Sequence, residues 1–170
     1  ICNKIITKDH GRSAKYIKYL AKEMSMVVDA MGKKGKKIPV TQLHWGGGTP
    51  TFLSHVEMTE LMQYIRQYFD LQEGGEYSIE IDPRRVTESD IQLLSQLGFN
   101  RISLGVQDFN LEVQQAVHRV QTFEETKAVL DWAKKYGFNS SSVDLIYGTP
   151  GESLEDWRET VESALALDID

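Results

Sequence analysis

Residues 43–50 read Leu43-His44-Trp45-Gly46-Gly47-Gly48-Thr49-Pro50, a short strand that runs into a triglycine turn. Glycine has no Cβ, so three glycines let the backbone approach a ligand closely and present its N–H and C=O groups. No lysine stands at the position that a phosphate-binding loop requires, and neither glycine fingerprint for nucleotides matches. The stretch therefore indicates either a plain tight turn or a site that holds a ligand through backbone groups, and it disfavours a phosphate loop.

Outward from this turn, strands and helices alternate along the chain. Strands are predicted over 39–45, 77–82, 101–107 and 142–147, and helices over 13–31, 54–69, 87–97, 110–118, 122–136 and 153–165. Several helices begin with a hydroxyl residue followed three residues later by an acid, which is the pattern of a capping box. Successive strands are roughly 25 to 40 residues apart, the length of a parallel βαβ crossover. We expect a single domain spanning residues 1–170, with one helix followed by four strand–helix units.

The two faces of the predicted strands differ in polarity. Alternate side chains of a strand point to opposite faces, and one face is apolar throughout: Leu43, Trp45, Tyr77, Ile79, Ile81, Ile102, Leu104, Val106, Val143, Leu145 and Tyr147. The other face carries small or polar residues, whereas an open doubly wound sheet is apolar on both sides. The pattern predicts an α/β fold of the partial (β/α) barrel type, with helices outside and a polar lumen.

Three lumen residues, Glu80, Gln107 and Asp144, lie towards the carboxyl ends of their strands, where barrel enzymes place their sites. The two carboxylates are expected to bind a cation or ribose hydroxyls, or to be structural partners of Arg101 or Arg119. The planar guanidinium of Arg119 suits a ligand carboxylate, with a surface ion pair as the alternative. No metal site is predicted, since the histidines lack metal-ligand spacing: His10, His44, His55 and His118.

The composition narrows the class of protein. The chain has 19 Lys and Arg against 25 Asp and Glu, a net charge of −6, which argues against a broad nucleic-acid interface. No run of about 18 apolar residues is present, so no membrane span is expected. Cys2 is the one cysteine, and the residues after Ile1 do not resemble a signal peptide. We expect a cytoplasmic protein and interpret the chain as a piece of a longer one.

Four stretches carry a resemblance to a known family. They read LHWGGGTPT at 43–51, IEIDPR at 79–84, GFNRISLGVQDF at 98–109 and DLIYGTP at 144–150. In this order they are similar to the oxygen-independent coproporphyrinogen III oxidases, which are radical S-adenosylmethionine (SAM) proteins. Residues 2–4 also resemble the end of the family's cysteine motif. Cys2 then matches its fourth cysteine, which follows the three cluster ligands without being one, and it is our candidate catalytic residue.

The resemblance implies a three-quarter barrel that uses two cofactors. A [4Fe–4S] cluster, whose three cysteine ligands would lie upstream of Ile1, binds SAM and cleaves it to a 5′-deoxyadenosyl radical. That radical starts the oxidative decarboxylation of two propionates, which converts coproporphyrinogen III to protoporphyrinogen IX in haem biosynthesis. An external one-electron donor is implied as a partner. Because the first strand and the cluster ligands would be missing, we expect these 170 residues alone to bind no cluster and to have no turnover.

The family's binding residues carry over onto matching positions of this sequence. Gly47 and Glu80 would contact the cluster-bound SAM. A second SAM would contact five further residues: Gly48, Thr49, Gln107, Arg119 and Asp144. Arg84 and Arg85 are expected either to meet substrate propionates or to lie in a solvated loop.

Two other functions are also compatible with these residues. Relatives of the family act as haem chaperones, which keep the barrel and lose the decarboxylase activity. Without the resemblance, the same residues would fit a barrel enzyme that binds some other small ligand at the triglycine turn.

Overall fold

The computed structural model describes residues 10–169, and its centre is a four-stranded sheet. The strands are β1 (Ile38–Trp45), β2 (Phe69–Ile81), β3 (Arg101–Gln107) and β4 (Ser140–Leu145). Their spatial order is β1-β2-β3-β4, and each strand is parallel to its neighbour. The sheet therefore grows in one direction along the chain, as the wall of a (β/α) barrel does, without the reversal of a doubly wound sheet.

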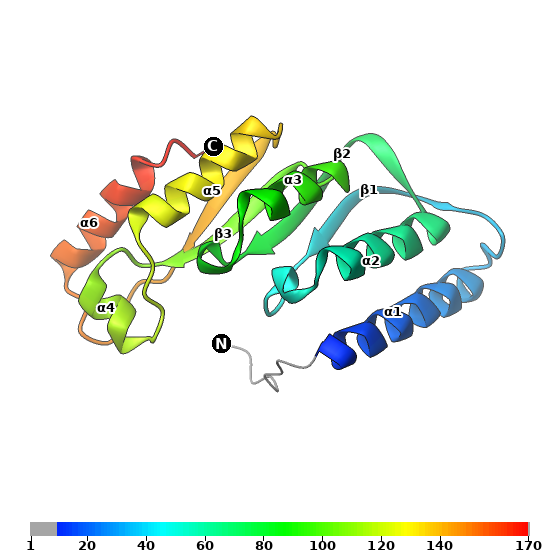
Figure 1. Cartoon of the computed structure of the whole chain (residues 1–170), viewed down its shortest axis with the longest axis horizontal. Helices are drawn as coiled ribbons and strands as arrows, with labels where there is room; N and C mark the ends of the chain where they lie inside the picture. Colours follow the sequence, from blue (N-terminus) through cyan, green and yellow to red (C-terminus); the bar gives the residue numbers. More distant parts are fainter. Residues whose placement is uncertain (1–9, 170) are drawn as a thin grey trace.

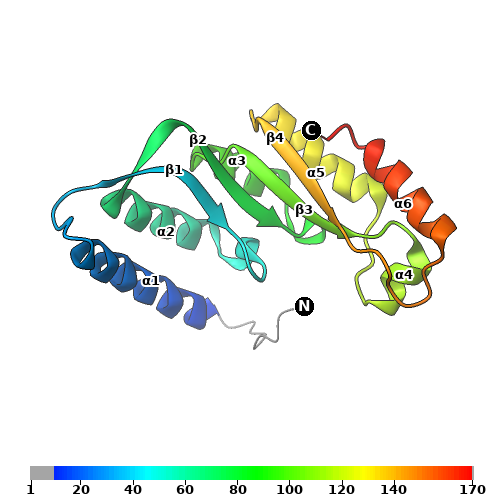
Figure 2. The same ribbon diagram turned by 180° about the vertical axis from the view of Figure 1, so that it is seen from behind.

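Helices cover one face of this sheet. They are α1 (His10–Ala30), α2 (His55–Tyr68), α3 (Glu88–Gln96), α4 (Leu111–Ala116), α5 (Phe123–Lys135) and α6 (Leu154–Leu165), with short 3₁₀ turns η1 (Pro50–Phe52) and η2 (Pro83–Arg85). Figure 1 shows α2, α3 and α5 in front of the sheet. Figure 2, seen from behind, shows the strands in front of these helices. This arrangement confirms the predicted α/β class with helices on a single side.

The predicted helix starts are confirmed by the caps that form there. Ser54, Thr122 and Ser153 each accept a hydrogen bond from the backbone N–H three residues on, and the acid at that position bonds back to the cap. Gly98, at φ +95°, ends α3 in a conformation that favours glycine. None of the helices within residues 10–169 has the length and apolar character needed to cross a bilayer.

The apolar parity of the strands forms the core, as predicted for β2 and β3. Ile79, Ile102, Leu104 and Val106 are completely buried against the helices. Removing each such side chain from water stabilises the folded state by about 1.5–3 kcal/mol. The prediction is wrong for Tyr147, which is exposed because β4 ends at Leu145 and the chain leaves the sheet before this residue.

The first half of β2 was not predicted, because residues 70–76 contain two glycines and three acids and resemble a loop. In the structure Phe69 pairs with Ile38 and Tyr77 pairs with Leu43, with an irregularity between these pairs. The Tyr77 hydroxyl bridges it, donating to the Gln72 carbonyl oxygen at 2.6 Å and lying 3.1 Å from the Val40 carbonyl oxygen. The pairing of β1 with β2 therefore begins earlier in the chain than the alternation of apolar residues predicts.

The end of β3 is anchored by buried polar side chains. Asp108, only 1% exposed, follows β3, and its Oδ1 accepts from the Thr160 hydroxyl of α6 at 2.6 Å. Gln121 donates its side-chain N–H to the Val106 carbonyl at 2.8 Å. These hydrogen bonds hold the chain in place on both sides of Gln107, whereas Asp108 Oδ2 and Gln121 Oε1 are buried with no hydrogen-bond partner among residues 10–169.

A buried carboxylate closes β2. Asp82 directly follows the strand, and its two oxygens accept from the Arg84 guanidinium at 2.9 Å (Nε to Oδ1) and 2.6 Å (Nη2 to Oδ2). Burial alone would raise the pKa of Asp82. The hydrogen bonds from Arg84 and the positive charge of Arg119 outweigh burial and hold that pKa below its usual value.

We expect Asp82→Asn to lower the free energy of unfolding near neutral pH by about 1–3 kcal/mol, because it removes a charge that the arginines satisfy. The pKa of Asp82 is lower in the folded than in the unfolded chain. Its stabilising effect is therefore present above the unfolded pKa of about 4 and is lost as the pH falls through the folded value. Denaturant titrations at several pH values should show the difference between variant and parent shrinking in acid.

Glu76→Gln is the matched control for this prediction. The Glu76 carboxylate lies 3.9 Å from the Arg101 guanidinium with its side chain 53% exposed, so its loss should change stability by less than about 1 kcal/mol. A destabilisation by Asp82→Asn that stays constant between neutral and acid pH would contradict the assignment.

Candidate functional site

The carboxyl ends of the strands surround a cavity of about 120 Å³. Six of the seven predicted cofactor-binding residues line it: Gly48, Thr49, Glu80, Gln107, Arg119 and Asp144. Ile81, Asp82 and Gly105 complete the lining. The seventh residue, Gly47, adjoins the cavity through its hydrogen bond to Glu80. Residues that are far apart in the sequence are thus brought together at one end of the sheet.

Glu80 is fixed by two donors at the end of β1. Its Oε2 accepts from the Gly47 peptide N–H at 2.9 Å, and its Oε1 lies 3.3 Å from His44 Nε2. The expected partners Arg101 and Arg119 do not contact it: Arg101 donates to the Ser140 hydroxyl. The Glu80 carboxylate is therefore held beside the triglycine turn, although Glu80 itself lies on β2.

Gly46 makes room for this arrangement. A Cβ at this position would lie 2.3 Å from His44 Nε2 and 2.6 Å from Glu80 Oε1. Both distances are shorter than any real contact of a Cβ atom, so a side chain here would displace the imidazole or the carboxylate. A side chain at the first glycine of the turn is thus possible only if His44 or Glu80 moves.

Arg119 is half-buried and is not the surface ion pair that the sequence left open. Its Nη2 donates to the Gly105 carbonyl at 2.7 Å and lies 3.7 Å from Asp82 Oδ1. Its Nε is buried and has no hydrogen-bond partner among residues 10–169. Burial lowers the pKa of Arg119, but the guanidinium stays charged because its usual pKa lies far above neutral pH. An unpartnered buried N–H on a cation beside a cavity suits an anionic ligand group.

Gln107 and Asp144 complete the polar lining from β3 and β4. Gln107 has a φ of +74°, which is uncommon for a residue with a side chain. The pairing of β3 with β4 shifts register at the same place, between Gly105 and Gln107. Asp144 is exposed, and its Oδ2 accepts from the Ser103 hydroxyl at 3.0 Å. Both residues lie at the strand ends that the sequence assigned to a site.

Two residues of this region were not named as candidates. Asp82 lines the cavity and forms ion pairs with Arg84, Arg85 and Arg119. His44 contacts Glu80. Both stand on the polar parity of their strands, which is the signal that could have identified them. Arg84 is engaged with Asp82, and Arg85 Nε lies 3.9 Å from Asp82 Oδ2 with its side chain 71% exposed.

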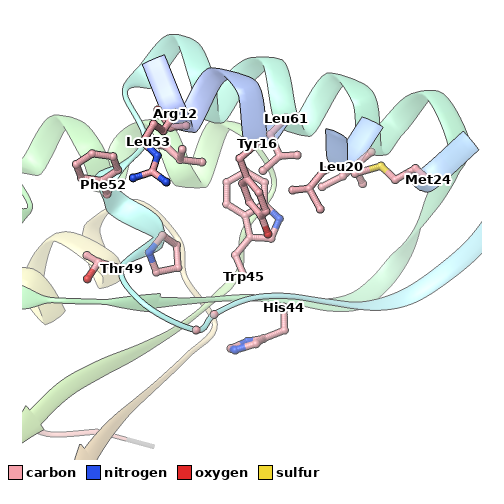
Figure 3. Close-up of a pocket in the computed structure, with 15 residues that line it drawn as sticks. Arg12, Tyr16, Leu20, Met24, His44, Trp45, Thr49, Phe52, Leu53 and Leu61 are labelled. Carbon is pink, nitrogen blue, oxygen red and sulfur yellow. The ribbon is translucent and has the colours of Figure 1, made fainter. Parts of the chain in front are cut away.

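A larger cavity of about 560 Å³ lies on the helix side of β1. Figure 3 shows Tyr16, Leu20 and Met24 of α1 facing it, with Trp45 pointing towards them and His44 on the other side of the strand. Its lining is mainly apolar and includes only two of the predicted residues, Gly47 and Thr49. The polar residues of the candidate site converge on the smaller cavity instead.

The prediction for Cys2 lies outside the described residues. Within residues 10–169, no group of three or more His, Cys, Asp or Glu side chains is placed to hold a metal ion. What the described site offers is one guanidinium, three carboxylates, of which Asp82 is already paired with arginines, and the backbone of a glycine turn. This set of groups can bind a ligand that carries a carboxylate, an ammonium and hydroxyls.

Comparisons with known proteins agree with this geometry. A family model described as the radical SAM superfamily matches residues 8–164. Relatives named oxygen-independent coproporphyrinogen III oxidase are 47% identical in Pseudomonas aeruginosa and 41% identical in Escherichia coli strain K12. Each alignment covers 99% of this chain, and the chain spans about 36% of the length of these relatives.

Solved structures show the same fold. The coproporphyrinogen III oxidase of Escherichia coli, described as a radical SAM enzyme, matches with a TM-score of 0.88 and 40% identity over all of this chain and 38% of its own. The radical SAM methyltransferase TsrM from Kitasatospora setae matches with a TM-score of 0.64 and 21% identity, over 90% of this chain and 29% of its own, and it supports the fold alone. Together with the one-sided parallel sheet, the family match over residues 8–164 shows that the chain belongs to the radical SAM superfamily.

Proposed function

We propose that this chain forms the SAM-binding part of an enzyme that converts coproporphyrinogen III to protoporphyrinogen IX without oxygen. The observation that carries the proposal is the convergence of Glu80, Gln107, Arg119 and Asp144 with the triglycine turn on one cavity. The names of the similar proteins supply the substrate class. None of these relatives is named as a haem chaperone, so the oxidase is the function that we propose.

Gly47 and Glu80 would hold the SAM that reacts. The Gly47 N–H already fixes one carboxylate oxygen of Glu80, and each oxygen keeps a lone pair for a further donor. An ammonium group or ribose hydroxyls of SAM can supply that donor. The glycines beside Glu80 have no Cβ, so no side chain of the turn blocks the approach of the ligand to the carboxylate.

The second SAM would be held by Gly48, Thr49, Gln107, Arg119 and Asp144. The buried, unpartnered Nε of Arg119 suits a carboxylate, which a guanidinium binds through two parallel hydrogen bonds. Asp144 remains exposed and can accept from an ammonium or a hydroxyl. A cavity of about 120 Å³ is small beside the roughly 300–1,000 Å³ of pockets that enclose a ligand. It would take one end of SAM, while the rest lies along the open face of the sheet.

When bound, the [4Fe–4S] cluster and SAM supply the one-electron chemistry that removes hydrogen from a substrate propionate. The residues of this chain bind and orient SAM for that step. The cluster ligands, a catalytic role of Cys2 and an external electron donor are parts of the proposal that the described residues do not contain. We also propose a single domain over residues 1–170 and a location in the cytoplasm.

Two glycine substitutions should separate the two SAM positions. A Cβ at residue 105 would lie 2.8 Å from Arg119 Nη2 and 3.1 Å from Gln107 Nε2. Gly105→Ala should therefore weaken only the second SAM, whereas Gly46→Ala, which displaces Glu80, should weaken the first. We expect about a tenfold loss of affinity in each case, since one charge-assisted contact is lost. Equilibrium dialysis of the intact protein with labelled SAM measures both sites.

In this experiment each variant is the control of the other. Both add a single methyl group beside the cavity, so a general loss of stability would affect both sites together. Equal weakening of both SAM positions by Gly105→Ala would contradict the assignment of Arg119 and Gln107 to one of them.

The proposed activity is tested with the intact protein that carries this chain. Anaerobic incubation with coproporphyrinogen III, SAM and a reductant should yield protoporphyrinogen IX over many turnovers. Glu80→Gln should lower the rate at least tenfold, because an amide loses the charge that holds SAM. Stoichiometric haem binding without turnover would instead identify a haem chaperone and overturn the proposal.

A further inference from the structure

His44 uses both of its ring nitrogens on the polar face of the sheet. Its Nδ1 lies 2.8 Å from the Ser78 hydroxyl, and its Nε2 lies 3.3 Å from Glu80 Oε1. Figure 3 shows the imidazole on the side of β1 opposite to Trp45, away from the helices. In the pairing of β1 with β2, His44 stands directly opposite Ser78, so the strand register brings the ring to both partners.

The partners determine which nitrogen carries the proton. An ionised Glu80 can only accept hydrogen bonds, so Nε2 of His44 is the donor in that contact. In a neutral ring Nδ1 is then the acceptor, and the Ser78 hydroxyl donates to it at 2.8 Å rather than to the Leu43 carbonyl, which is more distant at 3.4 Å. Ser78 is itself only 9% exposed, which restricts its side chain. The imidazole is thereby held in one orientation with its N–H directed at Glu80.

His44 and the triglycine turn hold Glu80 together. The Gly47 peptide binds Oε2 and the imidazole binds Oε1, so each carboxylate oxygen has one fixed donor. The Glu80 side chain is 41% exposed, and within residues 10–169 its hydrogen bonds are those with His44 and Gly47, so loss of the imidazole would leave the Gly47 contact to restrain it. A ligand that binds a pre-oriented carboxylate does not have to order it first.

We propose that His44 is a positioning residue that orients Glu80 for SAM through its Nε2–H, with Ser78 fixing the ring. This inference rests on the proposed function, because it assigns SAM as the ligand of Glu80. The atoms of the ring allow a direct test. The side-chain amide of glutamine places a nitrogen near the position of Nε2, whereas the amide of asparagine reaches only the position of Nδ1.

The experiment measures the dissociation constant of SAM for the intact protein that carries either His44→Gln or His44→Asn. His44→Asn should weaken the first SAM about tenfold, and His44→Gln should restore the affinity to within about threefold of the parent. In a Glu80→Ala background, His44→Asn should have less than about a twofold effect, because the residue it positions is gone. Equal losses in both substitutions, or the same loss with and without Glu80, would overturn the inference.

His55→Asn is the matched control. His55 Nε2 lies 2.6 Å from Asp90 Oδ1 on the helix side, so its loss also breaks a histidine–carboxylate contact. This variant should leave the SAM dissociation constant unchanged.

If His44→Asn fails to fold, ¹⁵N NMR of the ligand-free parent still tests the inference. The Nε2–H tautomer of His44 supports the inference, and the Nδ1–H tautomer overturns it. A parent that binds no SAM would refute the proposed function itself, which separates the two failures.

Discussion

The hydrogen bond from the Gly47 peptide to Glu80 joins the ends of β1 and β2, and the site depends on it. It forms only if the two strands are parallel and His44 stands opposite Ser78. The same register buries Trp45 and Ile79 against the helices. A slip of one residue would turn Glu80 into the core and Ile79 to the open face. Packing of the core and geometry of the site are therefore consequences of one register.

Much of this arrangement could be predicted because it follows from local patterns. The alternation Ile79, Glu80, Ile81 and the alternation Ile102, Ser103, Leu104 each assign an apolar and a polar face without knowledge of the tertiary structure. Helix starts depend on a cap and an acid three residues apart, which are also local. The placement of Glu80, Gln107 and Asp144 at one end of the sheet follows from parallel strands alone.

The remaining features depend on contacts between distant residues. The end of β4 at Leu145 follows from the register shift opposite Gln107, which no pattern within residues 140–147 encodes. The first half of β2 is a strand because β1 pairs with it, despite a composition typical of a loop. Arg119 follows α4, and only the folded chain brings its guanidinium to Asp82 and the Gly105 carbonyl. Its partners could not be read from residues near it in the sequence.

The charges around the cavity restrict the class of ligand. Glu80 and Asp144 would repel a phosphate, and a single arginine whose charge is partly satisfied by Asp82 does not outweigh them. A metal ion would meet the carboxylates but also the cation of Arg119. A zwitterionic amino acid avoids both conflicts, because its carboxylate and ammonium can each face a group of opposite charge. SAM has such an amino acid group, and its ribose hydroxyls add donors that a carboxylate accepts. The electrostatics of the described residues thus favour the ligand class that the superfamily name specifies, by an argument independent of sequence similarity.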